Sequence, residues 1–199
     1  MSTHVHDHEH SANVSQRVKQ LIARLEAQGV TSEQQLDAIV ESFLLHARPE
    51  NGYRIAARAW VDSAFKERLL TDANAAVAEL GIDLSHWAPV KLRVVENTPA
   101  VHNQIVCTLC SCYPIALLGP SPSWYKSEAY RARAVSEPRG VLAEFGVTVA
   151  PHARIVVWDS TAEARYMVLP QRPAGTEHLD ERGLAALVTR NGLIGTALV

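Results

Sequence analysis

The sequence predicts an α+β fold in which a helical N-terminal arm precedes a mixed domain. Two observations support this fold class. Apolar side chains recur at helical spacing through residues 13–81, and short β-branched runs alternate with helical segments after Gly81. The 199 residues are 47% hydrophobic and 20% charged, a balance typical of a globular protein and not of a disordered one.

We divide the chain into three predicted segments. Residues 1–12 form a flexible tail that either has no specific role or collects transition metals weakly. Residues 13–82 form the helical arm, whose short amphipathic helices need a partner surface as well as the rest of the chain. Residues 83–199 form the α+β domain. The histidines of the tail are His4, His6, His8 and His10.

Four helices are predicted in the arm. The first runs from Asn13 to Gly29, a glycine placed to end it. A capping box of Thr31 and Gln34 would open the second helix. A third, short helix follows the break at residues 49–52, and Asp62 would cap a fourth helix that reaches Gly81.

Strands and helices are both predicted after the arm. The β-branched and aromatic runs predict strands at Lys91–Val95, Gln104–Cys107, Arg154–Trp158 and Arg165–Leu169. Helical spacing predicts helices at Ser123–Ala134, Pro138–Phe145 and Asp180–Arg190.

Charge and hydropathy exclude several classes of protein. The net charge is −2 and no cluster of Lys and Arg occurs, so we expect no nucleic-acid partner. The longest weakly polar run, residues 105–119, is too short and too broken to span a bilayer. The polar N-terminus lacks the apolar core of a secretory signal. We therefore expect a cytoplasmic protein with no membrane partner.

The three cysteines of the chain lie within six residues. Cys107, Cys110 and Cys112 are too close together to staple a fold, so the cluster indicates metal or redox chemistry. Structural zinc usually takes a second, distant pair of ligands, and none exists here. His102 could supply a fourth ligand, but a single histidine so near the cluster is more often an ordinary strand or loop residue.

The spacing of the cluster permits a square-planar chelate. The sulfurs of Cys110 and Cys112 and the backbone nitrogens of Ser111 and Cys112 can fill four coplanar positions, with the Cys107 sulfur axial. One position then stays open, as catalytic metals require. Three thiolates and two deprotonated amides favour a trivalent ion such as cobalt(III) or iron(III) over zinc(II).

These residues resemble the nitrile hydratase alpha subunit family, cobalt type. The resemblance begins with the metal-binding signature Val106–Pro114 and covers nearly the whole chain after the tail. Further matching stretches are Ala59–Asp62, Val95–Thr98, Ser123–Lys126, Tyr130–Arg133, Pro138–Arg139, Leu142–Gly146, Arg165–Thr176 and Leu187–Arg190.

The resemblance implies a hydro-lyase that converts nitriles to amides. It implies a non-corrin cobalt(III) centre, with iron(III) as the alternative; Thr108 and Tyr113 match the cobalt type. The implied metal ligands are Cys107, Cys110, Ser111 and Cys112, and the implied catalytic residues are Cys112, Cys110 and Ser111. Cys110 would become a sulfinic acid and Cys112 a sulfenic acid.

The resemblance also implies a layered α/β/β/α domain and several partners. The alpha subunit would act with a beta subunit as an αβ heterodimer, itself assembled into a dimer of heterodimers, on a small nitrile and with a maturation chaperone. The resemblance leaves three alternatives for the group that attacks the nitrile: the Cys112 sulfenate oxygen, a water that this oxygen activates, and a hydroxide on the metal.

Two other functions remain open. The metal-bearing subunit of thiocyanate hydrolase shares the signature, and Ile115–Ala116 stand where the nitrile hydratase family usually has Trp-Pro. A cobalt carrier or maturation form, which would hold the ion with the tail and the cysteines, is the non-catalytic alternative.

Overall fold

The computed structural model describes residues 4–84, 90–109 and 112–199, with side chains from residue 13 onward. The chain forms two compact units, Met1–Leu45 and His46–Val199. The sequence predicts a helical arm that ends at residue 82. The structure divides the chain earlier because the helices after residue 48 bury side chains such as Ile55, Phe65 and Leu69 in the core of the second unit.

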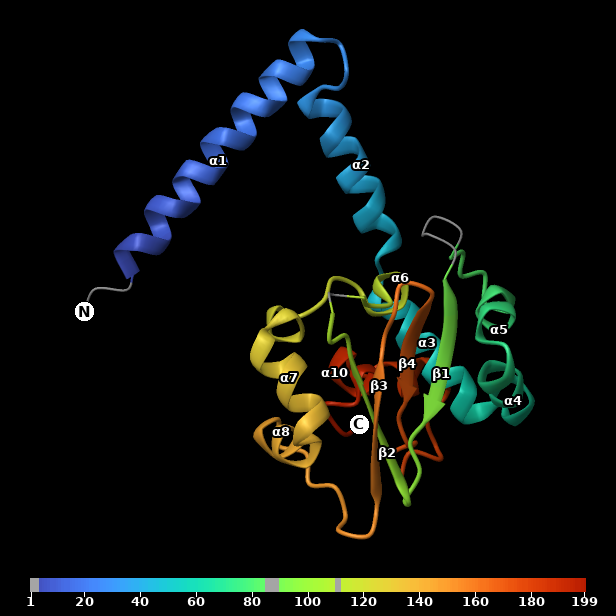
Figure 1. The fold of residues 1–199 in the computed structure, drawn as a ribbon. Coiled ribbons are helices and arrows are strands. Elements are labelled where there is room, and N and C mark those ends of the chain that lie inside the picture. Colours follow the sequence, from blue (N-terminus) through green and yellow to red (C-terminus); the bar gives the residue numbers. More distant parts are fainter. Residues whose placement is uncertain (1–3, 85–89, 110–111) are drawn as a thin grey trace. The chain divides into compact units, whose positions relative to one another are not determined.

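The first unit contains helices α1 (His4–Ala27) and α2 (Glu33–His46) (Figure 1). Gly29, with φ of +65°, ends α1 as predicted. The capping box of α2 lies one residue later than predicted: the Gln35 amide donates to Ser32 Oγ at 3.2 Å, and the Ser32 amide donates to Gln35 Oε1 at 3.0 Å. Both positions fit the Ser/Thr-x-x-Gln pattern, so spacing alone could not distinguish them.

Helix α1 begins well inside the segment that we had assigned to a flexible tail. Its first residue is His4, whereas the predicted tail extends to residue 12. No Gly or Pro occurs between His4 and Ala27, so nothing in the sequence interrupts the helical backbone over this range.

Helices α3 (Pro49–Val61), α4 (Ser63–Thr71) and α5 (Ala73–Glu79) open the second unit. Asp62 caps α4 as predicted, accepting a hydrogen bond from the Phe65 amide at 2.9 Å. The predicted single helix from Asp62 to Gly81 is wrong. Asp72 interrupts it because its side chain accepts from the Ala75 amide at 3.2 Å and starts α5.

Two parallel strand pairs lie at the centre of this unit. Strand β1 (Lys91–Glu96) pairs with β4 (Ala164–Leu169), and β2 (Val101–Val106) pairs with β3 (Arg154–Asp159). Strands β2 and β4 contact each other and join the two pairs. The register of the second pair places Val106 opposite Asp159, so the chain leaves β2 and β3 at the same end of the sheet.

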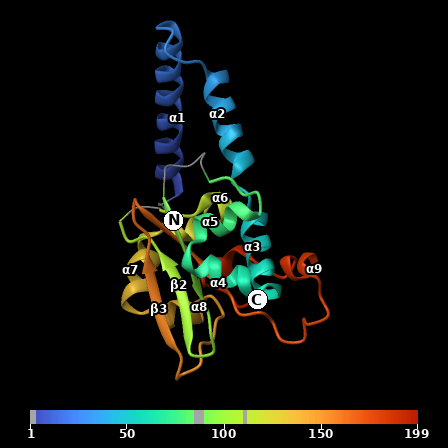
Figure 2. The ribbon, with the colours of Figure 1, turned by 90° about the vertical axis from the view of Figure 1, so that its right-hand side faces the viewer.

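Helices cover both outer faces of the strand layers (Figures 1 and 2). Helices α7 (Glu128–Ser136) and α8 (Pro138–Glu144) contact β2 and β3, whereas α4 and α5 contact β1. This order of layers confirms the predicted α+β fold and its α/β/β/α arrangement. Within the described residues, no helix is long and apolar enough to cross a membrane.

The remaining helices are short. They are α6 (Ile115–Leu118), the 3-10 helix η1 (Ser123–Lys126), α9 (Glu181–Ala185) and α10 (Arg190–Ile194). The predicted helix Ser123–Ala134 is therefore broken in two, and Ser127 caps the second piece by accepting from the Tyr130 amide. The predicted helix Asp180–Arg190 is too long, since α9 ends at Ala185. Thr189 then accepts from the Gly192 amide and caps α10, which begins at the last residue of the predicted range.

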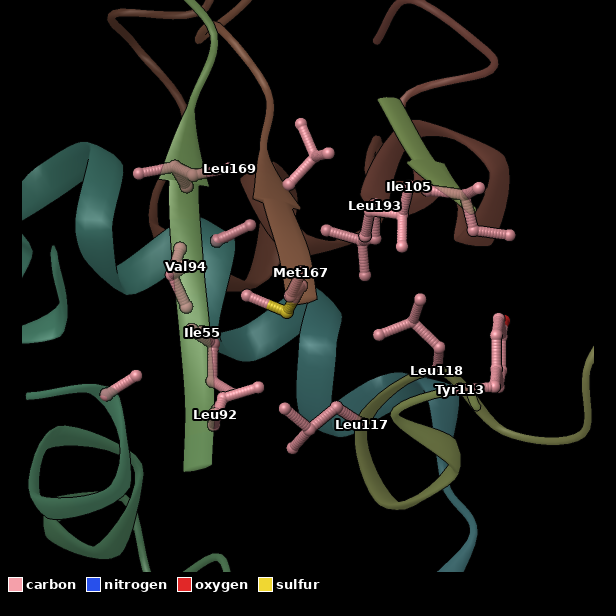
Figure 3. Packing of buried hydrophobic residues seen from close by; sticks show 14 of the residues in the cluster. Ile55, Leu92, Val94, Ile105, Tyr113, Leu117, Leu118, Met167, Leu169 and Leu193 are labelled. Carbon is pink, nitrogen blue, oxygen red and sulfur yellow. The ribbon is translucent and has the colours of Figure 1, made fainter. Parts of the chain in front are cut away.

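The core joins elements that are far apart in the sequence. Figure 3 shows Met167 of β4 between Val94 of β1 and the side of the core that contains Ile105 and Leu193. Leu117 and Leu118 of α6 are buried in the same cluster. These two residues lie five and six positions after Cys112, so their burial fixes the chain on the C-terminal side of the cluster.

Candidate metal centre

The cysteine cluster begins where β2 ends. Cys107 follows Val106, the last residue of the strand, and its side chain is buried. Cys112 is half-buried and packs against the hydrophobic core. The structure thus places two of the four predicted metal-binding residues, and the other two, Cys110 and Ser111, lie outside the described residues.

The first end of the loop is held by the neighbouring strand. Asp159, the last residue of β3, accepts a hydrogen bond from the Thr108 amide at 2.9 Å and a second from the Thr108 hydroxyl. Both bonds go to one carboxylate, and bonds to a charged acceptor are stronger than neutral ones. The residue after Cys107 is therefore fixed in both its backbone and its side chain.

The second end of the loop is held by a buried tyrosine. The Tyr125 hydroxyl donates to the Cys112 carbonyl oxygen at 3.1 Å, and its ring packs edge-to-face on Tyr113 with centroids 4.9 Å apart. Burial and the neighbouring Tyr130 raise the pKa of Tyr125 above its ordinary value. The hydroxyl consequently keeps its proton and remains a donor.

Helix α7 supports the end of β2 and the start of the loop. The Tyr130 hydroxyl donates to the Ile105 carbonyl oxygen at 2.6 Å and accepts from Gln104 Nε2 at 3.3 Å. Burial raises the pKa of Tyr130. The next residue, Arg131, donates through Nη1 to the Thr108 carbonyl oxygen at 3.5 Å. One helix thus contacts the backbone on both sides of Cys107.

His102 does not belong to this site. It lies five residues before Cys107 in the extended strand β2, a separation of about 16 Å. Its Nε2 lies 2.8 Å from the Gly195 carbonyl oxygen, and burial lowers its pKa. Of the two ordinary roles expected for this histidine, strand or loop residue, the structure shows the strand.

The described donors fit a transition-metal centre. A buried and a half-buried thiol stand at the two ends of a six-residue loop, and separate hydrogen bonds hold the chain beside each of them. Thiolates bind transition metals well, and a loop fixed at both ends presents them at constant spacing. Cobalt or iron would therefore meet a suitable set of donors here.

Sequence reasoning missed most of the residues that support this loop. The sequence analysis did not single out Asp159, Tyr130 or Arg131 as site residues. Asp159 would have been indicated by a parallel pairing of the two β-branched runs that end near Cys107 and Asp159, because parallel strands place their carboxyl ends at the same edge. Tyr130 and Arg131 lie in the stretch Tyr130–Arg133 that matches the family, but nothing in that match indicates that they contact the loop.

Comparisons with known proteins identify the family of the chain. The family model for the nitrile hydratase alpha chain matches residues 12–197. The low-molecular weight cobalt-containing nitrile hydratase subunit alpha of Rhodococcus rhodochrous is 52% identical over 185 residues, which cover 93% of this chain and 88% of that protein.

Two further relatives define the breadth of the family. A solved double mutant of the Fe-type nitrile hydratase from Comamonas testosteroni Ni1 superposes with a TM-score of 0.87 at 42% identity, covering 94% of this chain and 90% of that one. Thiocyanate hydrolase subunit gamma of Thiobacillus thioparus is 42% identical over 154 residues, covering 73% of this chain and 63% of that protein. Because the family model spans nearly the whole chain and these identities are high, the chain belongs to the nitrile hydratase alpha-chain family.

Proposed function

We propose that this chain is the metal-bearing alpha subunit of a nitrile hydratase, a hydro-lyase that converts nitriles to amides. The observation that carries this proposal is the anchoring of the Cys107–Cys112 loop at both ends, by Asp159 and by Tyr125. A fixed loop of thiolates is what a permanently bound catalytic ion needs. The relationship to cobalt-containing nitrile hydratase subunits supports the same reaction.

The proposed ligands are the sulfurs of Cys107, Cys110 and Cys112 together with the backbone nitrogens of Ser111 and Cys112. We propose non-corrin cobalt(III), because Thr108 and Tyr113 match the cobalt-type signature and the relatives include cobalt-containing enzymes. Iron(III) is the alternative, since an Fe-type enzyme shares the fold. When bound, the ion supplies Lewis acidity that polarises the carbon of the nitrile.

The chain's own residues would orient the reacting groups. Cys110 as a sulfinic acid and Cys112 as a sulfenic acid place oxygen atoms beside the ligand sulfurs. The oxygen on Cys112 takes a proton from a water, and the water oxygen attacks the nitrile carbon. In the alternative route the oxygen on Cys112 attacks the carbon itself, its S–O bond breaks as the product forms, and a water then restores the S–OH group. Tyr125 holds the Cys112 carbonyl, which restricts the position of the oxygen on Cys112. The resulting imidate tautomerises to the amide.

A beta subunit is the proposed partner, in an αβ heterodimer that pairs into a dimer of heterodimers, and a chaperone would assist maturation. The first unit supports this proposal, because helix α2 has no buried side chain while Ile39, Val40 and Phe43 are exposed. Exposed apolar side chains in a row are typical of a surface that a partner covers. We propose a cytoplasmic location for the complex.

Thiocyanate hydrolysis is the second candidate function. Ile115, the first residue of α6, is half-buried against the core and lies three positions after Cys112. The nitrile hydratase family usually has an aromatic residue there. A chain without that ring offers a differently shaped site, and the relationship to thiocyanate hydrolase subunit gamma favours a test of both substrates.

The test is co-expression with the beta subunit, followed by metal analysis, peptide mass measurement and assay of both substrates. We expect one cobalt per chain, two added oxygens on Cys110 and one on Cys112, and amide formation from a nitrile. Zinc bound to unmodified cysteines would overturn the catalytic proposal. Release of carbonyl sulfide and ammonia from thiocyanate, without amide from any nitrile, would select the second candidate.

A further inference from the structure

Ser160 is a buried serine that the proposed reaction leaves without a role. It directly follows Asp159, the last residue of β3, and only 3% of its surface is exposed. Within the described part of the chain, its hydroxyl oxygen is buried and forms no hydrogen bond. A buried hydroxyl without a partner lowers the stability of a protein, so an acceptor is expected beside it.

The backbone places Ser160 beside Cys107. Strands β2 and β3 are parallel, and their register pairs Val106 with Asp159. The Ser160 amide donates to the Val106 carbonyl oxygen at 2.8 Å, so the same pattern continues one residue past the strands. Cys107 and Ser160 are therefore neighbours across the pair, at a backbone separation of about 4.8 Å.

The side chains of Cys107 and Ser160 lie on the same face of the strand pair. Paired residues of neighbouring strands project to one side, and the side alternates along each strand. Asn103 and Trp158 lie on this face, four and two positions earlier, where Trp158 Nε1 donates to Asn103 Oδ1 at 2.9 Å. Cys107 is 1% exposed and Ser160 is 3% exposed, so water has little access to either group.

A third group, the Tyr125 hydroxyl, lies close to both side chains. Burial and Tyr130 raise the pKa of Tyr125, Cys107 raises it further, and Ser160 opposes the rise. The Tyr125 hydroxyl donates its proton to the Cys112 carbonyl oxygen, so it has no second proton for a neighbour. Ser160 has a proton to donate, and rotation about its χ1 bond directs that proton. A negatively charged acceptor makes such a bond stronger.

We propose that Ser160 is a positioning residue, whose hydroxyl donates a hydrogen bond to the Cys107 sulfur in the metal-loaded subunit. This inference rests on the proposed function, because Cys107 becomes a charged acceptor when it is a thiolate ligand. A hydrogen bond to a ligand sulfur fixes the direction of the ligand and reduces its donation of electrons to the metal. The Ser160 hydroxyl thereby strengthens metal retention and leaves the ion more Lewis acidic.

Absorption spectra of the cobalt-loaded complex with its beta subunit test this contact. Charge transfer from thiolate to cobalt gives a band whose energy depends on the hydrogen bonds to the sulfur. Ser160→Ala should move this band to longer wavelength, because the sulfur becomes a stronger donor. Ser160→Thr keeps a hydroxyl and should restore the original band, which a loss of packing alone would not explain.

Competition with a chelator gives a second measurement on the same complex. The complex is loaded with cobalt(II) without oxygen, so that the cysteines stay unmodified and the ion exchanges freely. Loss of an outer-shell partner costs about 10–100-fold in metal affinity, so Ser160→Ala should bind cobalt(II) at least about tenfold more weakly. Ser160→Thr should bind it as the original chain does.

The matched control is Thr196→Ala, which removes a buried hydroxyl outside the cysteine loop. Thr196 is 1% exposed, and its hydroxyl donates to the Asn191 carbonyl oxygen. This variant should lose stability while the charge-transfer band and the cobalt affinity stay unchanged. A shift of the band in this control as large as that in Ser160→Ala would overturn the proposal, because the shift would then follow from lost stability.

The same comparison in a Tyr125→Phe background shows which acceptor Ser160 uses. If the hydroxyl reaches Cys107 directly, Ser160→Ala shifts the band equally in both backgrounds. A shift that disappears without the Tyr125 hydroxyl would overturn the proposal, because Ser160 would then act through Tyr125.

The outcomes also separate this inference from the proposed function. An unchanged band and cobalt affinity in Ser160→Ala, in a complex that still binds cobalt and hydrates a nitrile, would overturn the role of Ser160 and leave the proposed function intact. An original complex that binds no cobalt and shows no charge-transfer band would overturn the proposed function, and the role of Ser160 with it.

Discussion

The carboxylate of Asp159, at the end of β3, accepts hydrogen bonds from both the amide and the hydroxyl of Thr108, which follows the end of β2. Their meeting depends on the parallel pairing of β2 with β3, whose register sets Val106 opposite Asp159. A shift of one residue in that register would point the Asp159 side chain to the other face of the sheet. The start of the cysteine loop is therefore held by the topology of the sheet.

Replacement of Asp159 by Ala should loosen the loop and reduce metal retention. Both bonds to Thr108 disappear, and because the pair lies at the surface we expect only about 1 kcal/mol less unfolding free energy. The cobalt content of the purified complex should fall more clearly than its melting temperature. Thr108→Ser is the matched control, since it keeps both donors and should retain cobalt. Full cobalt content in the Asp159 variant would show that the carboxylate does not position the loop.

Replacement of Tyr125 by Phe tests the other end of the loop. The Cys112 carbonyl would lose the hydrogen bond from the Tyr125 hydroxyl, and one such bond contributes about 1 kcal/mol to stability. We expect a lower unfolding free energy together with a lower kcat, because the reacting oxygen on Cys112 is less restricted. Phe145→Leu removes an aromatic neighbour of Trp124 and Tyr130 but no hydrogen bond. A loss of stability without a change in kcat in both variants would mean that Tyr125 acts through packing alone.

The buried tyrosines predict a loss of stability in alkali. Burial raises the pKa of Tyr113, Tyr125 and Tyr130, so the folded protein keeps these protons after the unfolded chain has released them. Above about pH 10, the ordinary tyrosine pKa, the unfolding free energy should then fall with pH, by about 1.4 kcal/mol per pH unit for each tyrosine. Below that pH the three groups should contribute no slope.

Urea denaturation between pH 9.5 and 11 measures this slope. Lysine and cysteine groups titrate in the same range, so the contribution of a tyrosine is measured by the difference in slope between variants. Tyr130→Phe should reduce the slope by about one proton relative to the original chain. Phe145→Leu lowers stability without removing a titrating group and should keep the original slope. An unchanged slope in Tyr130→Phe would contradict the assignment of this tyrosine as a proton-retaining buried group.

The fold was predictable where local signals decide it. Each predicted strand overlaps an observed one and its ends lie within three residues of the observed ends, because β-branched runs between turns mark strands directly. Two errors occur at Asp72 and Ser127, where a side chain caps a new helix inside an apolar stripe that continues. The helical spacing of apolar residues does not reveal such a break, because the apolar face resumes in the next helix.

Only the part of the candidate site that is contiguous in the sequence was predictable. The three cysteines form a local pattern, so their chemistry could be inferred from spacing and from the resemblance to a family. Asp159 and Tyr130 contact the loop from β3 and α7, and such contacts depend on the pairing of strands and the packing of layers. No periodicity in a single sequence encodes which strand lies beside which, so these supports had to come from the structure.

Replacement of Ile115 by Trp should change the choice of substrate. Ile115 is half-buried at the start of α6, next to the loop, and an indole there would fill space beside the reacting groups. A difference of one or more methylenes in a pocket is worth about 10–200-fold in kcat/KM, so the ratio between a small and a bulky nitrile should move by at least about tenfold toward the small one. Ile115→Val changes the volume little and should keep the ratio. Equal ratios in the two variants would place Ile115 away from the substrate.

Replacement of Ile39 by Asp should weaken the association with the beta subunit. The side chain of Ile39 is 66% exposed in helix α2, so a charge there should change the stability of the isolated chain by less than about 0.5 kcal/mol. In a covered apolar surface the same charge is desolvated without a partner and opposes binding. We expect the dissociation constant from the beta subunit to rise at least about tenfold, corresponding to about 1.4 kcal/mol. Val135→Asp is the control, because Val135 is a comparably exposed apolar residue of the second unit. If both variants bound the beta subunit as tightly as the original chain, the apolar row of α2 would not be part of the interface.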